Sequence, residues 1–156
     1  MILFQEKRLG KYLAKAIALT LLVTYGLLII GSFIISNPED GPGVDISILG
    51  FFRAVILSPA IETVLMIFTT QILLAFVSVR LVYISIFNAL LWAGAHSVFY
   101  PLWGIFTFFP FFIFTNAYLD WRKHSKKIAF FAAFSIHTAL NLSTFILIWF
   151  EGVLLS

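Results

Sequence analysis

The chain has no cysteine, and only 11% of its 156 residues are charged. The lack of cysteine excludes disulfides, thiolate nucleophiles and cysteine-ligated metal sites. A soluble domain carries about 25% charged residues, whereas this chain is 62% hydrophobic and has a mean hydropathy of +1.05. The composition therefore predicts an integral membrane protein.

The sequence also has little that would attract nucleic acid. The formal net charge is +3 and the pI is about 9.3, but most of the basic residues gather in two short clusters, at 7–15 and 122–127. Basic clusters beside apolar runs are typical of the cytoplasmic ends of membrane helices. Membrane lipid is therefore an expected partner, and nucleic acid is not.

Five long apolar runs predict five membrane-spanning helices, because a helix needs about 20 apolar residues to cross the hydrocarbon layer. They lie at about 12–35, 58–78, 81–98, 102–118 and 128–150. The first run is too long for a secretory signal and ends in no small-residue cleavage site, so we expect a retained helix. Sustained apolarity without alternation argues against a β-barrel.

Two shorter segments precede the second long run. Residues 37–45 are polar, acidic and rich in turn residues, and predict a loop. Residues 46–57 are too short to span and predict an interfacial or re-entrant half-helix, with Ser58 and Pro59 as the N-cap and first position of the next helix. The predicted fold is an all-α polytopic membrane bundle, a single domain over 1–156 with about five transmembrane helices plus one half-helix.

The distribution of basic residues predicts a topology. The N-terminal cluster, Arg80 and the 122–127 cluster all fall on one side of such a bundle, and the acidic loop falls on the other. Basic residues are enriched in cytoplasmic loops. We therefore expect a multi-pass protein of the cell membrane with a cytoplasmic N-terminus.

Four ionisable residues lie well inside apolar runs, where an unpaired charge costs several kcal/mol, on the order of 3 or more. They are Arg53, Glu62, His96 and His137. Asn141 follows His137 by one helical turn and shares its face. Counting about 1.5 Å per residue places Glu62, His96 and Asn141 at roughly 21–25 Å from the basic side, and His137 at about 15 Å. Polar groups from three helices should therefore meet.

Several proteolytic chemistries do not fit these residues. No histidine is followed by glutamate, as a zincin motif requires. An aspartyl intramembrane protease needs two buried aspartates, and the three aspartates, Asp40, Asp45 and Asp120, are all expected in loops. Ser32 lacks the context of a rhomboid-type nucleophile. A glutamate base with histidine partners remains.

Three short motifs resemble those of the CPBP family, which comprises type II CAAX prenyl endopeptidases and bacterial relatives linked to bacteriocin processing and immunity. The Pro-led helix start with a glutamate pair is similar to the segment from Pro59 with Glu62. The motifs aromatic-x-x-x-His and H-x-x-x-N resemble Trp92 to His96 and His137 to Asn141. Thr63 replaces the second glutamate of the family, and Ile67 replaces its arginine.

The resemblance implies an intramembrane glutamate-type endopeptidase that cleaves a peptide or protein substrate at the membrane, with its catalytic core over about 46–150. It implies that Glu62 and His96 hold and deprotonate a water, while His137 and Asn141 donate hydrogen bonds to the oxyanion. No cofactor is expected.

Three alternatives stay open. Two histidines and a glutamate could ligate zinc and leave an open position. The altered first motif suits a non-catalytic immunity or accessory membrane protein on the same fold. A transport or channel subunit could relay protons through the same side chains.

Overall fold

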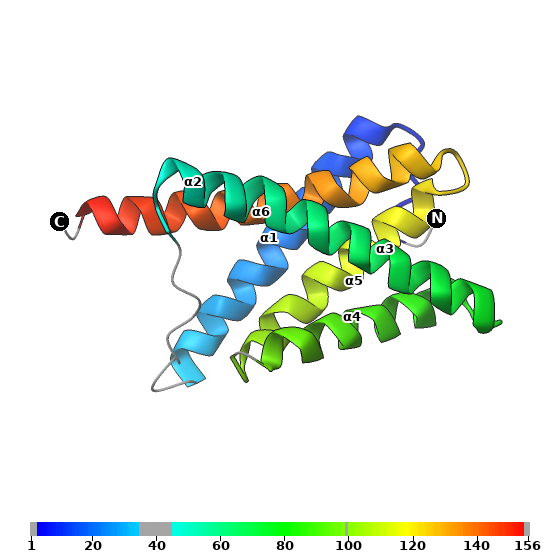
Figure 1. Ribbon diagram of the computed structural model, residues 1–156, viewed down its shortest axis with the longest axis horizontal. Coiled ribbons are helices and arrows are strands. Elements are labelled where there is room, and N and C mark those ends of the chain that lie inside the picture. Colours follow the sequence, from blue (N-terminus) through cyan, green and yellow to red (C-terminus); the bar gives the residue numbers. More distant parts are fainter. Residues whose placement is uncertain (1–2, 35–44, 99, 155–156) are drawn as a thin grey trace.

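The computed structural model describes residues 3–34, 45–98 and 100–154, and within these the regular structure is entirely helical (Figure 1). The elements are α1 (Leu9–Ile34), α2 (Ile48–Phe51), the π-helix η1 (Phe52–Leu57), α3 (Ser58–Phe76), α4 (Leu81–Ser97), α5 (Trp103–Trp121) and α6 (Lys126–Leu154). The predicted all-α membrane bundle is confirmed. The predicted loop at 37–45 lies outside the described residues except for Asp45.

Three helical stretches of the described chain are long and apolar enough to cross a membrane. They are Leu9–Phe33, Ile48–Phe76 and Lys126–Glu151. The apolar helix α4 is shorter, at 17 residues. The lengths and composition therefore support membrane association.

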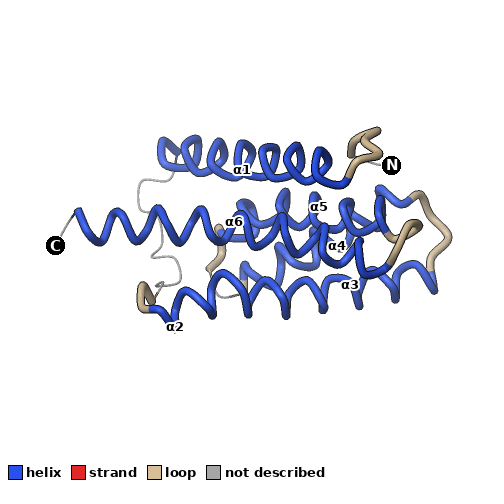
Figure 2. The backbone as a smooth tube through the Cα atoms, turned by 90° about the horizontal axis from the view of Figure 1, so that it is seen from above, coloured by secondary structure: helices blue, strands red, loops and turns tan. Residues whose placement is uncertain are grey.

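Helix α5 is the centre of the bundle and contacts α1, α3, α4 and α6 (Figures 1 and 2). Its residues from Ile113 to Trp121 are all buried, which is expected of a helix that is largely apolar around its whole circumference. The other long helices surround it, so their outward faces stay apolar and exposed.

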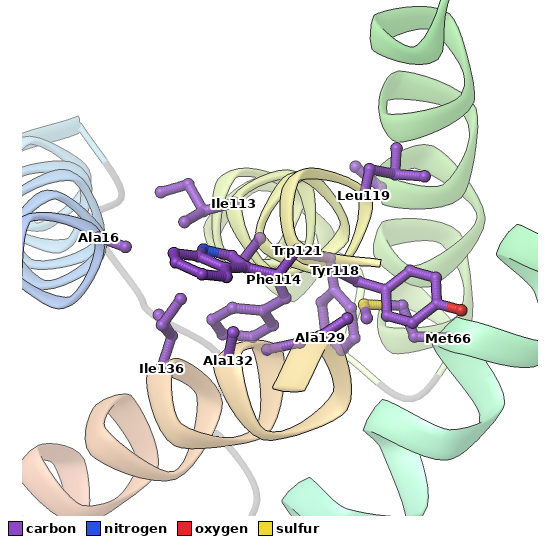
Figure 3. Close-up of a cluster of buried hydrophobic side chains, with 14 of the residues drawn as sticks. Ala16, Met66, Ile113, Phe114, Tyr118, Leu119, Trp121, Ala129, Ala132 and Ile136 are labelled. Carbon is purple, nitrogen blue, oxygen red and sulfur yellow. The ribbon is translucent and has the colours of Figure 1, made fainter. Parts of the chain in front are cut away.

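The core packs large side chains of α5 against small side chains of its neighbours. Figure 3 shows Phe114 and Tyr118 beside Ala129 and Ala132 of α6, with Ala16 of α1 opposite. Small residues let helix backbones approach closely, and close packing stabilises membrane bundles because lipid offers no hydrophobic contrast. This packing fixes α6, which carries two of the predicted site residues.

A glycine allows α4 and α5 to meet closely where they are joined. A Cβ on Gly104 would lie 2.6 Å from the carbonyl oxygen of Ala93 and 2.2 Å from the hydroxyl of Ser97. The Gly104 N–H donates to that hydroxyl at 3.2 Å. The end of α4, where His96 lies, is thereby held against α5.

The expected half-helix is present as α2 and η1, but it runs without a break into α3. Ser47, rather than Ser58, caps this helix, since its hydroxyl accepts from the N–H of Gly50. Ser58 already has helical backbone angles, φ −60° and ψ −53°, and its N–H donates to the carbonyl of Arg53. Pro59 has no N–H to donate, and a π-type segment is a known way to accommodate such a gap in the hydrogen-bond ladder. The prediction of Ser58 as N-cap was therefore wrong.

Asn88 joins α3, α4 and α5 through a buried polar network. Its amide nitrogen donates to the hydroxyls of Thr70 and Thr115 at 2.9 and 3.2 Å, and its oxygen accepts from Thr69 at 2.7 Å. Buried polar groups that are satisfied in this way hold membrane helices in register. The network fixes α3 and α4, which carry Glu62 and His96.

Asp120 is not in a loop as predicted, but in the last turn of α5. It is only 6% exposed, and it accepts hydrogen bonds from the Tyr12 hydroxyl at 2.9 Å and the Leu3 N–H at 3.2 Å. Tyr12 covers Asp120, because its ring packs against Trp121, the next residue along α5. Asp45, the other described aspartate, is exposed, so the described residues still lack the buried pair that an aspartyl protease needs.

The basic segments share one end of the bundle. The N-terminal segment, the α3–α4 connection and the α5–α6 connection lie together, and the start of α2 and the C-terminal end of α6 lie at the other end (Figures 1 and 2). The described chain therefore has one strongly basic end.

Candidate functional site

Three of the four predicted site residues meet in the bundle. The Oε2 atom of Glu62 in α3 lies 3.6 Å from Nε2 of His137 in α6 and 3.9 Å from Nε2 of His96 in α4. The side chains of Glu62 and His96 are 22% and 24% exposed, whereas His137 is 5% exposed. The cluster thus combines a largely buried imidazole with two more exposed side chains.

Glu62 is held by a serine one turn earlier. The Ser58 hydroxyl donates to Oε1 of Glu62 at 2.5 Å, across the i to i+4 spacing that places two side chains on one helix face. One carboxylate oxygen is therefore engaged, and the other faces the imidazoles. The sequence contained this signal in the spacing, but Ser58 was interpreted as a cap.

His96 is oriented by its own helix. Its Nδ1 lies 2.8 Å from the carbonyl oxygen of Trp92, and a carbonyl can only accept, so Nδ1 carries a proton. In the neutral ring Nε2 is then an acceptor. That nitrogen faces the carboxylate of Glu62.

His137 lies between an aromatic wall and a threonine. The ring of Phe114 stacks on it with centroids 4.5 Å apart, and the hydroxyl of Thr63 lies 3.5 Å from its Nδ1. Thr63 is fully buried. The residue that stands where the resembling family has a second glutamate is therefore a polar neighbour of His137.

Phe111 links the surroundings of the two histidines. Its ring stacks on Trp92 at 4.7 Å, and its centroid lies 5.4 Å from that of His96 and 5.5 Å from that of His137. It is only 2% exposed. Phe111 is one of five phenylalanines in 108–114, and nothing in the sequence of that run distinguishes it from its neighbours.

Asn141 shares a helix face with His137, but its observed partner is the backbone of η1. Its Nδ2 donates to the carbonyl oxygen of Ala54 at 2.9 Å. A primary amide carries two N–H groups, so this bond uses one of them. Asn141 therefore ties α6 to the π-helical segment and is not hydrogen-bonded to the other three site residues.

The remaining candidates lie apart from the cluster. Ile67 packs against the core. Arg53 is exposed in η1. Hydrogen bonds from Ser47 hold the pKa of Asp45 below its usual range, with a smaller contribution from the charge of Arg53. Arg53 is thus associated with the start of α2 rather than with Glu62.

The described residues include no group of three histidine, cysteine or acidic side chains arranged to hold a metal ion. Comparison of the chain with protein-family models, with curated proteins and with solved structures gives no match in any of the three.

The geometry of the cluster suits the activation of a water. A water oxygen about 2.8 Å from both Glu62 Oε2 and His96 Nε2 would subtend about 90°, close to the angle between the two O–H bonds of water. Both protein atoms are acceptors when His96 is neutral. A water bound there would have its protons directed at two bases.

Proposed function

We propose that the protein is an intramembrane endopeptidase of the glutamate type, which hydrolyses a peptide bond of a membrane-associated substrate. The observation that carries the proposal is the convergence of one carboxylate oxygen with two imidazole nitrogens, at 3.6 and 3.9 Å, from three separate helices. Ionisable groups at membrane depth are costly and usually functional. The resemblance of the three motifs to the CPBP family favours the same chemistry.

In the proposed reaction, water held by Glu62 and His96 attacks the carbonyl carbon of the substrate. A bond forms between the water oxygen and that carbon, and the released proton passes to the Glu62–His96 pair. The C–N bond then breaks, and the same proton passes to the leaving amine. The products are a carboxylic acid, which keeps the second proton of the water, and an amine, with no further reactant.

The oxyanion needs hydrogen-bond donors in this scheme. When the Thr63 hydroxyl donates to Nδ1 of His137, the proton of that ring is on Nε2, which faces the reacting centre. The second N–H of Asn141 is the other proposed donor. Donors in a site with little water stabilise a developing charge more strongly than they would in water.

An apolar groove beside α6 suits a membrane-associated substrate. It has a volume of about 430 Å³ and lies between α2 and the part of α6 that follows Asn141. Phe51, Leu142 and Phe145 are among its lining residues. In the proposal, apolar side chains of a substrate segment bind there, and none of the four site residues lines this groove.

The proposed orientation has the N-terminus in the cytoplasm and the chain crossing the cell membrane several times. The basic end of the bundle supports it through the positive-inside rule. His96 then lies about 22 Å along α4 from Leu81, which is in the outer half of the membrane. We therefore propose a substrate that is reached from within or outside the membrane, and not a prenylated tail presented from the cytosol.

The test is cleavage of a membrane-peptide library by purified protein in detergent. Glu62→Gln and His96→Ala should abolish cleavage, because each removes a base that contacts the water. His124→Ala is the matched control, since this histidine is exposed in the α5–α6 connection, and it should cleave as the wild type does. A chelator should have no effect.

Three outcomes would overturn the proposal in different directions. Loss of activity on chelation and recovery with zinc would establish a metal mechanism. Absence of wild-type cleavage, together with proton flux in liposomes that Glu62→Gln abolishes, would indicate a transport protein. Absence of both activities would favour the accessory protein, for which the replaced Glu and Arg of the first motif are the specific observation.

A further inference from the structure

A second groove lies between α3, α5 and α6, away from the Glu62 cluster. It has a volume of about 280 Å³, and none of Glu62, His96, His137 and Asn141 lines it. Its lining residues are Val64, Ile67, Gln71, Tyr118, Lys126 and Phe130. Because α3 and α6 are membrane-crossing candidates, the groove opens where acyl chains would surround the protein.

Apart from Lys126, the wall of this groove is apolar except for one hydrogen-bonded pair. Gln71 donates a hydrogen bond to the hydroxyl of Tyr118, so these two polar groups already use each other. Val64, Ile67 and Phe130 present only hydrocarbon. The deep part of the groove therefore favours an apolar ligand.

Lys126 contributes the charge in this groove. It is exposed and is the first residue of α6, and within the described chain no carboxylate lies at ion-pair distance from it. The positive end of the α6 dipole lies at the same place and favours an anion. The adjoining connection adds Arg122 and Lys123.

We propose that this groove binds one anionic phospholipid, with an acyl chain against Val64, Ile67 and Phe130 and the phosphate at Lys126. The two halves of the groove match the two halves of such a lipid in polarity and charge. Lys126 lies at the basic end of the bundle. A lipid headgroup there places the acyl chain along α3, toward the middle of the membrane. This proposal does not depend on the proposed protease activity.

The experiment is a lipid titration of delipidated protein in detergent, followed by native mass spectrometry. Phosphatidylglycerol should bind more tightly than phosphatidylcholine with the same chains. Lys126→Gln should weaken phosphatidylglycerol binding about five-fold, as expected for one basic contact at a membrane surface. Lys127→Gln, at the neighbouring exposed position outside the groove, should leave it unchanged.

A second pair of variants tests the acyl-chain half. Val64→Trp should fill the groove and weaken both lipids, while Phe68→Trp, on the same helix but outside the groove, should weaken neither. Both positions are more than half exposed, at 54% and 62%, so a tryptophan is tolerated in each. Glycerol phosphate without chains should not bind.

Three results would overturn the proposal. Equal binding of the two lipids, or equal losses in Lys126→Gln and Lys127→Gln, would reduce the effect to general surface charge. Unchanged binding in Val64→Trp would place the lipid elsewhere. Binding of glycerol phosphate alone would identify an anion site rather than a lipid site.

Discussion

The carboxylate of Glu62 lies among polar side chains and is partly exposed. The Ser58 hydroxyl donates to one oxygen, the rings of His96 and His137 face the other, and partial exposure leaves room for water. A buried charge without such partners costs several kcal/mol, on the order of 3. The arrangement therefore engages one carboxylate oxygen and leaves the other beside two imidazoles, where there is room for a water.

A substitution of Asn141 tests whether this residue acts on the proposed reaction or only on the fold. Asn141→Ala should lower kcat by about two to three orders of magnitude, the usual effect of removing an oxyanion donor, with little change in KM. The loss of its bond to Ala54 should also lower the melting temperature. Cleavage kinetics and thermal melting in detergent measure the two effects.

Ser143→Ala is the control for this prediction. Its hydroxyl bonds to that of Tyr25 at 2.7 Å, half a turn further along α6, so its loss should affect stability without affecting kcat. An Asn141→Ala protein that melts early but keeps the wild-type kcat would assign Asn141 to structure alone.

At the scale of elements, the π-helical segment η1 determines which backbone carbonyl lies against α6. The carbonyl of Ala54 belongs to η1 and accepts from Asn141. In a regular α-helix the residues before Pro59 would be rotated relative to α3, because a π segment holds more residues per turn. Pro59 thus affects the site from a distance, through the backbone of η1.

Pro59→Ala should let η1 return to α-helical hydrogen bonding and remove the Ala54 carbonyl from Asn141. We expect the cleavage rate to fall about ten-fold, which corresponds to roughly the 1–1.5 kcal/mol of one hydrogen bond. Initial rates and the melting temperature should be measured together. The matched control is Pro101→Ala, an exposed proline in the α4–α5 connection, and wild-type rates in Pro59→Ala would contradict this role of η1.

At the scale of the whole molecule, the bundle has two unlike ends. The N-terminal segment and the connections with Arg80 and with Arg122 and Lys123 share one end, and Asp45 precedes α2 at the other (Figure 2). The cytoplasmic surface of a membrane retains basic segments. The asymmetry therefore predicts which loops face the cytoplasm.

The lack of cysteine makes this topology directly measurable, because each introduced cysteine is the only thiol. A membrane-impermeant maleimide should label Asp45→Cys on intact cells, and should label Lys123→Cys only after permeabilisation. The unaltered chain should not react. Labelling of both variants from the same side would contradict the proposed orientation.

The sequence by itself determined the class of fold and most of the candidate residues. Apolarity over about 20 residues is a local property that predicts a membrane helix, and an ionisable residue within such a run is costly wherever the helix packs. Glu62, His96 and His137 were identifiable for that reason. The i to i+4 spacing of His137 and Asn141 was also local and predicted their common face.

Only the tertiary structure decided which groups meet. Phe111 lies between two histidines, Asn141 bonds to Ala54, and Asp120 is buried against Tyr12, and none of these contacts follows from spacing within one helix. They depend on how helices rotate and approach one another. That arrangement comes from packing over the whole bundle, because lipid-like surfaces give no local preference for one partner over another.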